Sequence, residues 1–139
     1  MTVTATPIFP QTINNTFVQI LPADTTTKKT IYTGGTNGSK IENICITNTD
    51  TGAYTLNVYI TASATDYLIG TVSVPLSAGN TTAAPSINLL ALANFLPCNF
   101  DAFGNKYMYL ASGSVLKVAS TTTVTTAKAV TVYCQGGDF

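Results

Sequence analysis

The most regular pattern in the chain is a strict alternation of apolar and polar residues that begins at residue 54 and ends at residue 61. Every second position is apolar, namely Tyr54, Leu56, Val58 and Ile60. Because successive side chains of a strand point to opposite faces, this period of two predicts a strand with one buried face. A charge at the centre of that face, as in Val58→Asp, is expected to unfold the domain.

Similar but less regular runs predict strands along most of the chain. In the run 40–48, Ile44 and Ile46 share a face whereas Ile41 is out of phase, which predicts a β-bulge between them. The apolar run 86–92 fits either a strand or one short helical turn, the latter near residues 89–94. The expected strands are 16–21, 28–33, 40–48, 54–61, 67–74, 86–92, 106–110, 115–121 and 127–134.

Two local expectations follow from phase and turn chemistry. In the run 67–74, the side chains of Leu68, Val72 and Val74 are expected to point inward. Between Leu110 and Val115 lies the sequence Ala-Ser-Gly-Ser, which is typical of a tight hairpin turn.

Clusters of Gly, Asn, Asp and Ser separate these runs at short intervals, and no segment sustains a helical period. In a chain of 139 residues this pattern predicts one all-β domain, an antiparallel β-sandwich of about eight to nine strands, with a jelly roll favoured and the strand order left open. The domain is expected to span residues 16–139. Residues 1–15 contain two prolines and no alternation, which fits a frayed tail or an extended N-terminal arm that places Phe9 on a neighbouring subunit.

The composition argues against catalysis and against nucleic-acid binding. Charged residues make up 9% of the chain, against about 25% in typical domains, and the net charge is zero. The chain has no His, which removes the commonest general base and metal ligand. It also has no Arg and no excess of positive charge, which phosphate binding would need. We therefore expect no enzymatic activity, no cofactor and no nucleic-acid partner.

The three cysteines, Cys45, Cys98 and Cys134, are an odd number without CxxC spacing, which argues against a disulfide framework and against a zinc site. Cys134 shares its strand phase with Val130 and Val132, so it is expected to be a small buried apolar residue.

Three loops superficially resemble ligand-binding motifs, and each is interpreted as a turn. The segments 101–105 and 48–52 lack the further acidic ligands of a calcium loop. The glycines of 34–38 are followed by neither a helix nor a Lys-Ser/Thr pair, so they do not form a phosphate-binding loop. The first residues lack the pattern of a secretory signal, and no apolar run approaches 18 residues, so no membrane partner is expected.

A neutral surface rich in Thr and Tyr suits self-association or attachment to a larger surface, because burying it does not desolvate ions. The C-terminal residues 136–139 fit a loose tail or a small docking hook. Alternatively, Tyr59, Tyr32 and Tyr107 could stack on sugars. The candidate interface residues are Phe9, Phe17, Tyr59 and Phe139.

Three blocks of sequence, taken together, resemble a known family. They are GGTNGSKIENICITNTDTGAYTLNVYI (34–60), DYLIGTVSVPLSAGNTTAAPSINLL (66–90) and LPCNFDAFGNKYMYLASGSVLKV (96–118). They resemble the capsid cement (decoration) proteins of short-tailed bacteriophages of the Bordetella phage type, over roughly residues 30–139. The shared features are turns and strand patterns, so the resemblance assigns no functional residue.

The resemblance implies a jelly-roll homodimer on the outside of an HK97-like phage head. There it would bridge and stabilise subunits of the major capsid protein, after synthesis in the cytoplasm of the bacterial host. Two alternatives stay open at this point: a tail or fibre-base β module that binds host-surface sugar, and a lectin-like carbohydrate-binding module.

Overall fold

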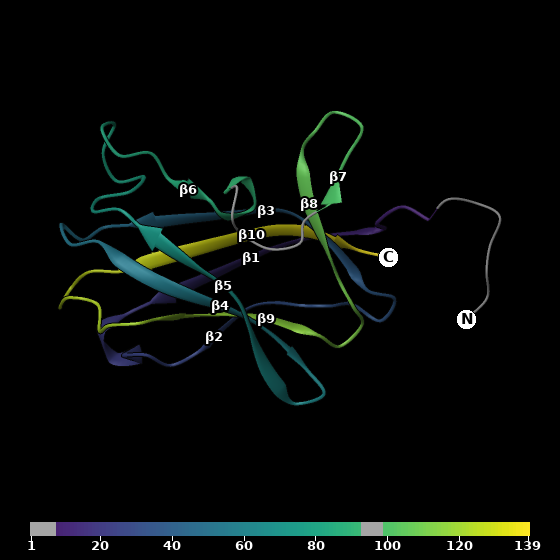
Figure 1. Cartoon of the computed structure of the whole chain (residues 1–139), viewed down its shortest axis with the longest axis horizontal. Coiled ribbons are helices and arrows are strands. Elements are labelled where there is room, and N and C mark those ends of the chain that lie inside the picture. The colour runs from purple at the N-terminus through teal and green to yellow at the C-terminus, as the bar shows by residue number, and fades with distance from the viewer. Residues whose placement is uncertain (1–7, 93–98) are drawn as a thin grey trace.

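The computed structural model describes residues 8–92 and 99–139, and almost all of their regular structure is β-strand (Figure 1). The strands form two antiparallel sheets that enclose one apolar core. The elements are β1 (Thr12–Ile20), η1 (Pro22–Asp24), β2 (Lys29–Thr33), β3 (Ser39–Asn48), β4 (Tyr54–Ala62), β5 (Thr65–Val74), β6 (Ile87–Asn88), η2 (Leu89–Ala91), β7 (Asn99–Phe100), β8 (Lys106–Leu110), β9 (Val115–Ser120) and β10 (Val130–Asp138), where η marks a 3-10 helix.

The strand order identifies the sandwich as a jelly roll. One sheet has the order β1-β10-β3-β8-β7, with β6 also paired to β3, and the other has the order β2-β9-β4-β5. The long pairings are nested: β1 pairs with β10, β2 with β9, β3 with β8 and β4 with β5, all antiparallel. A long antiparallel ribbon rolled over itself gives this pattern, which is the eight-stranded jelly roll. The predicted all-β sandwich is confirmed, and the strand order is now fixed.

The β-bulge predicted in β3 is present. Gln135 of β10 pairs with Asn43 whereas Gly136 pairs with Ile41, so one extra residue, Glu42, lies between the two partners on β3. The extra residue shifts the phase of the strand, and Ile41 therefore joins the inward face together with the even-numbered isoleucines.

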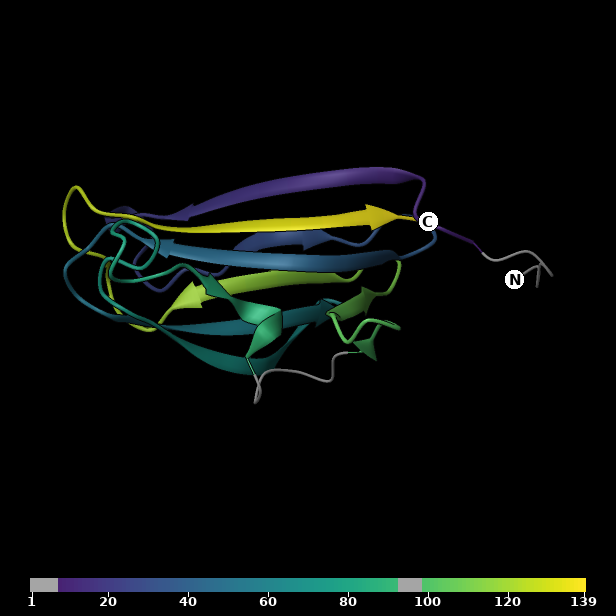
Figure 2. The same cartoon turned by 90° about the horizontal axis from the view of Figure 1, so that it is seen from above.

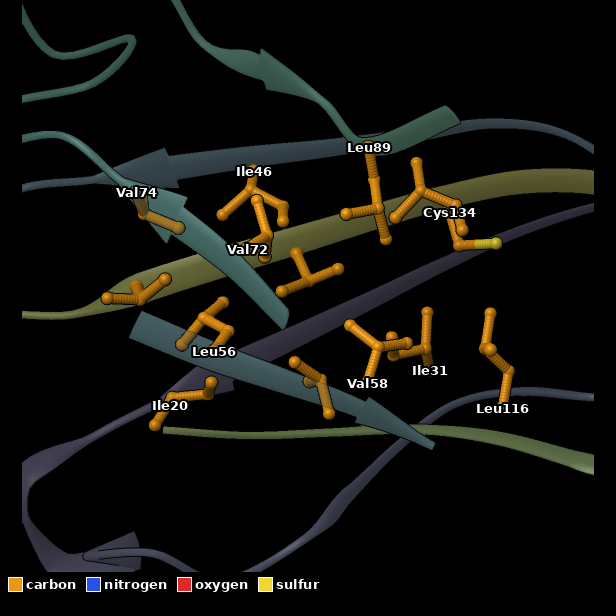
Figure 3. Packing of buried hydrophobic residues seen from close by; sticks show 14 of the residues in the cluster. Ile20, Ile31, Ile46, Leu56, Val58, Val72, Val74, Leu89, Leu116 and Cys134 are labelled. Atoms are coloured by element: carbon orange, nitrogen blue, oxygen red, sulfur yellow. The ribbon is translucent and has the colours of Figure 1, made fainter. Parts of the chain in front are cut away.

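Branched aliphatic side chains from both sheets fill the space between them (Figure 3). Leu56 and Val58 of β4 are fully buried, as the alternation predicts, and Cys134 of β10 is buried among them. Burial raises the pKa of the Cys134 thiol to about 12, so this cysteine is a packing residue and not a thiolate nucleophile. Of the other cysteines, Cys45 is half-buried and Cys98 lies outside the described residues.

The inward position predicted for Leu68 is wrong, because its side chain is 57% exposed. The register of β4 with β5 shifts between Val58 and Tyr59, so that Val58 pairs with Gly70 and Tyr59 with Leu68. The shift leaves Ile69 as the extra residue, and Ile69 packs against the core in place of Leu68.

The segment between Leu110 and Val115 is a tight turn but not a hairpin. The amide of Ser114 donates to the carbonyl of Ala111 at 3.0 Å, and Gly113 has a positive φ of 69°. The strands on its two sides belong to different sheets, since β8 pairs with β3 and β9 pairs with β2 and β4. Turn chemistry alone does not distinguish a sheet-to-sheet corner from a hairpin.

Both ends of the described chain are more ordered than the sequence indicates. β1 begins at Thr12, so residues 12–15, which the sequence assigns to the arm, pair with β10. The arm residues 1–7 lie outside the described residues. At the other end β10 continues to Asp138 and pairs on both sides, so the interpretation of 136–139 as a loose tail is wrong.

The loop 48–52 is a hydrogen-bonded turn built around two buried polar side chains. The Asn48 amide donates to the carbonyls of Gly52 at 2.8 Å and Pro75 at 3.0 Å. The neighbouring Asp50 is buried, and the hydroxyls of Thr125 and Tyr54 hold the pKa of its carboxyl well below the usual range. The carboxylate therefore serves to close this end of the sandwich.

The depressed pKa of Asp50 predicts loss of stability in acid. A carboxyl that binds its proton less tightly in the folded state stabilises the fold above the unfolded pKa of about 4, and this contribution disappears as the pH falls. We expect the urea midpoint to fall progressively below about pH 4 and to fall less steeply in Tyr54→Phe, which removes one of the two hydroxyls. A midpoint that stays constant to about pH 2.5 would contradict this assignment.

Candidate interaction surface

Four large apolar side chains at the beginning of the described chain are exposed, and together we call them the N-terminal stripe. They are Ile8, Phe9, Ile13 and Phe17, with exposed fractions between 58% and 78%. Two of them, Phe9 and Phe17, are candidate interface residues from the sequence. The stripe also contains Ile13, which sequence reasoning missed because it placed the start of the strand at residue 16.

The geometry of β1 explains why the stripe is exposed. Along β1 the residues at 14, 16 and 18 are half-buried and the residue at 20 is buried, whereas those at 13, 15, 17 and 19 face outward. Phe17 lies against the ring of Tyr133 on β10, with 4.9 Å between the ring centroids. Ile13 and Phe17 therefore lie on the outer face of the sheet, along its border, where Figure 2 shows β1 beside β10 with no ribbon beyond it, whereas Ile8 and Phe9 precede β1.

Tyr59 is on the other sheet and does not join the stripe. Its ring is half-buried beneath the ammonium group of Lys28, which lies 4.4 Å from the ring centroid. Lys28 also bonds Asp66 at 2.8 Å, and hydrogen bonds from Lys28, Thr61 and Lys117 hold the pKa of the Asp66 carboxyl well below its usual range. Tyr59 is therefore part of a charged cluster on the outer face of the second sheet.

Phe139 is half-buried and held by backbone contacts. Its amide donates to the carbonyl of Gly38 at 3.2 Å, its carbonyl accepts from the Asn37 amide at 3.2 Å, and its ring is 6.0 Å from that of Tyr109. This residue closes the end of the sheet and does not project as a docking hook.

Each of the three tyrosines considered for sugar stacking is either buried or has a lysine over one face of its ring. Tyr32 is buried, Tyr59 lies under Lys28, and Tyr107 lies under Lys40 with 4.6 Å between the ammonium and the ring centroid. Stacking on a sugar needs an open aromatic face, so the positions of these three residues weaken the case for the carbohydrate-binding alternatives.

A polar groove of about 620 Å³ lies on the outer face of the first sheet, beside β8. Its lining includes an ion pair between Lys40 and Glu42, with 2.8 Å between nitrogen and oxygen. The lining also includes Asn43, whose side-chain oxygen is buried and has no hydrogen-bond partner among the described residues. Polar residues make up most of the lining, and several of them already bind one another, since Lys40 binds Glu42 and Asp101 binds Asn105.

The described part of the chain contains neither a metal-binding cluster nor a helix suited to span a membrane. Within residues 8–92 and 99–139, no group of three or more His, Cys, Asp or Glu side chains could hold a metal ion. In the same residues, no helix is long and apolar enough to cross a membrane. The feature that stands out from the rest of the surface is thus the N-terminal stripe.

Comparison with known proteins adds little to this picture. No family model and no curated protein matches the chain. Among solved structures, the chain is similar to the nucleoplasmin-like N-terminal domain of Drosophila FKBP39, with a TM-score of 0.39 and 10% sequence identity over 95% of this chain and 96% of that chain.

Proposed function

We propose that this protein is a capsid cement (decoration) protein, which binds the outside of an HK97-like phage head and stabilises the major capsid protein subunits that it bridges. The observation that carries the proposal is the N-terminal stripe, a row of exposed apolar side chains on a jelly roll with few charges. Large apolar side chains that gather on an exposed surface are typical of protein–protein interfaces. The three sequence blocks that resemble phage cement proteins are the reason for proposing the major capsid protein as the partner.

The mechanism is mechanical, not chemical. A protein that binds the expanded shell more tightly than its precursor stabilises the expanded shell by linkage. Because the contacts hold neighbouring subunits together, they resist the outward pressure of packed DNA. An uncharged contact surface keeps the desolvation cost of this attachment low.

The test of the proposal is the molar ratio of this chain to the major capsid protein in purified particles, measured by quantitative mass spectrometry. A ratio near one, or a simple fraction above about one-half, supports a cement role, because such a protein covers the whole shell. A ratio of a few per cent would overturn it and favour a tail or fibre-base module.

The stripe makes a specific prediction for shell binding. Replacing two of its members, as in Ile8→Ser/Phe9→Ser, should weaken binding to shells that lack this protein by at least about tenfold, since burial of each large apolar side chain contributes about 1.5–3 kcal/mol. Cosedimentation with the shells measures the effect. The matched control is Phe103→Ser, which removes an even more exposed phenylalanine, 92% accessible, from the loop between β7 and β8. Equal binding of both variants and the wild type would exclude the stripe as the contact.

A further inference from the structure

β1 has the properties of an edge strand that can pair with a strand of another molecule. β1 has nine residues and lies at the end of its sheet, and no described strand pairs with its outer side. Its register with β10 runs without a shift from Thr12 to Ile20, and it contains neither a proline nor a charged residue. A free edge of this kind exposes a row of unpaired N–H and C=O groups.

The other borders of the two sheets carry the features that prevent such pairing. β2 has Lys29 and a register shift, and β5 has Asp66 and a register shift. The border opposite β1 is formed by β6, β7 and β8, none of which is longer than five residues. Charges, bulges and short strands are the usual means of protecting an edge, so β1 is the unprotected one among the borders described.

We propose that two copies of this chain pair through β1, antiparallel to each other about a two-fold axis at Asn15, so that the first sheet continues from one copy into the other. This dimer would be the unit that bridges capsid subunits, so its biological meaning rests on the cement function proposed above. A two-fold axis perpendicular to the sheet keeps outward side chains of both copies on one face.

The register follows from the two exposed apolar residues of β1. With the axis at Asn15, Ile13 of each copy lies directly opposite Phe17 of the other, on the outer face. With the axis at Thr16, the same residues would lie opposite Gln19 and Asn15, and neither apolar side chain would gain an apolar partner. Directly opposed side chains in an antiparallel pair have Cβ atoms about 4.5–5.5 Å apart and interact favourably when both are apolar. Of these two registers, only the first places both Ile13 and Phe17, which are 78% and 70% exposed in the single chain, opposite an apolar side chain.

Charge supports a second copy as the occupant of this edge. A strand without charge can lie beside its own copy with no repulsion between like charges, whereas the edge strands β2 and β5 carry Lys29 and Asp66. The pairing also leaves Ile8 and Phe9 of each copy outside the shared sheet, because they precede β1. A dimer would therefore present two such segments to the shell, which is what a bridging protein needs.

The test compares two double variants of the full chain by sedimentation. We expect the wild type to be a dimer. In Ile13→Lys/Phe17→Lys, the proposed register places Lys opposite Lys twice, so the dimer dissociation constant should rise at least about tenfold. In Ile13→Glu/Phe17→Lys, the same register places Glu opposite Lys twice, so dimers should form more tightly than in the Lys/Lys variant. Phe103→Lys, away from β1, is the matched control and should remain a dimer.

Several results would overturn the pairing. The pairing is wrong if the wild type stays monomeric at about 100 µM, or if the Lys/Lys variant dimerises normally. Loss of the dimer on deletion of residues 1–7 would instead identify the N-terminal segment as the occupant of the edge. These outcomes are separate from shell binding: a monomer that still coats shells overturns the pairing alone, and a β1-paired dimer that binds no shell overturns the cement role alone.

Discussion

Val58→Asp is expected to abolish the folded state. Val58 is fully buried at the centre of β4, which pairs with β5 on one side and β9 on the other. The nearest cation along the paired strand, Lys117, lies opposite Tyr59 on the outer face and is not available to the new carboxylate. A buried charge without a partner costs more than about 4–5 kcal/mol, which is comparable with the whole stability of a domain of this size. Circular dichroism during urea denaturation should show no cooperative transition.

Two further substitutions test whether burial causes this loss. Thr55→Asp introduces the same carboxylate on the exposed face of the same strand, and the protein should stay folded with a midpoint close to that of the wild type. Val58→Thr keeps the shape of the side chain but buries a hydroxyl, and it should cost about 1–3 kcal/mol. If Val58→Asp unfolds at the same urea concentration as Thr55→Asp, the inward face of β4 has been assigned wrongly.

The sequence predicts those parts of the fold that depend on local pattern. The inward face of β4 can be read from a period of two, and the bulge in β3 can be read from the phase of Ile41, because both signals lie within one strand. The position of Leu68 could not be read in the same way, since the shift at Ile69 appears only in the pairing of β5 with β4. The order of the strands in each sheet depends on pairing between segments that are far apart in the sequence. Local pattern therefore does not predict the strand order.

The candidate surface was predictable to a similar degree. Phe9 is exposed ahead of the first strand, and Phe17 is exposed on the outward face of β1. Whether Tyr59 and Phe139 are covered depends on Lys28 and Tyr109, which are distant in the sequence. Whether a side chain is covered by a residue distant in the sequence therefore cannot be judged from the pattern within a strand.

The C-terminal end of β10 is fixed by one carboxylate, and its removal is the second change with a large expected effect. Asp138 accepts hydrogen bonds from the Asn14 amide at 2.6 Å, from the Tyr32 hydroxyl at 2.9 Å and from the Ser39 hydroxyl. These donors belong to β1, β2 and β3, so the carboxylate links three other strands from both sheets. Tyr32 and Ser39 are buried, and without Asp138 their hydroxyls lose this acceptor.

Asp138→Ala should therefore cost about 2–5 kcal/mol, since each buried donor left without a partner costs about 1–3 kcal/mol. Asp138→Asn should lose less stability, because its amide oxygen can still accept from the two hydroxyls. The matched control is Glu42→Ala, which removes an exposed carboxylate from β3 and should change stability by no more than about 0.5 kcal/mol. Urea denaturation measures all three, and equal midpoints for Asp138→Ala and Glu42→Ala would contradict the linking role.

Asp138→Ala also tests the proposed dimer, because it should loosen the backbone of β1 without changing the apolar side chains that would pair. The loss of the bond to Asn14 loosens the first half of β1, whereas the side chains of Ile13 and Phe17 are unchanged. Hydrogen exchange of the amides in residues 12–15 should become faster in Asp138→Ala, because local opening of this end then costs less free energy. If β1 pairs with its own copy, raising the protein concentration should slow that exchange again by shifting the chain into the dimer. Exchange that is fast at every concentration would mean that the edge of β1 stays free in solution.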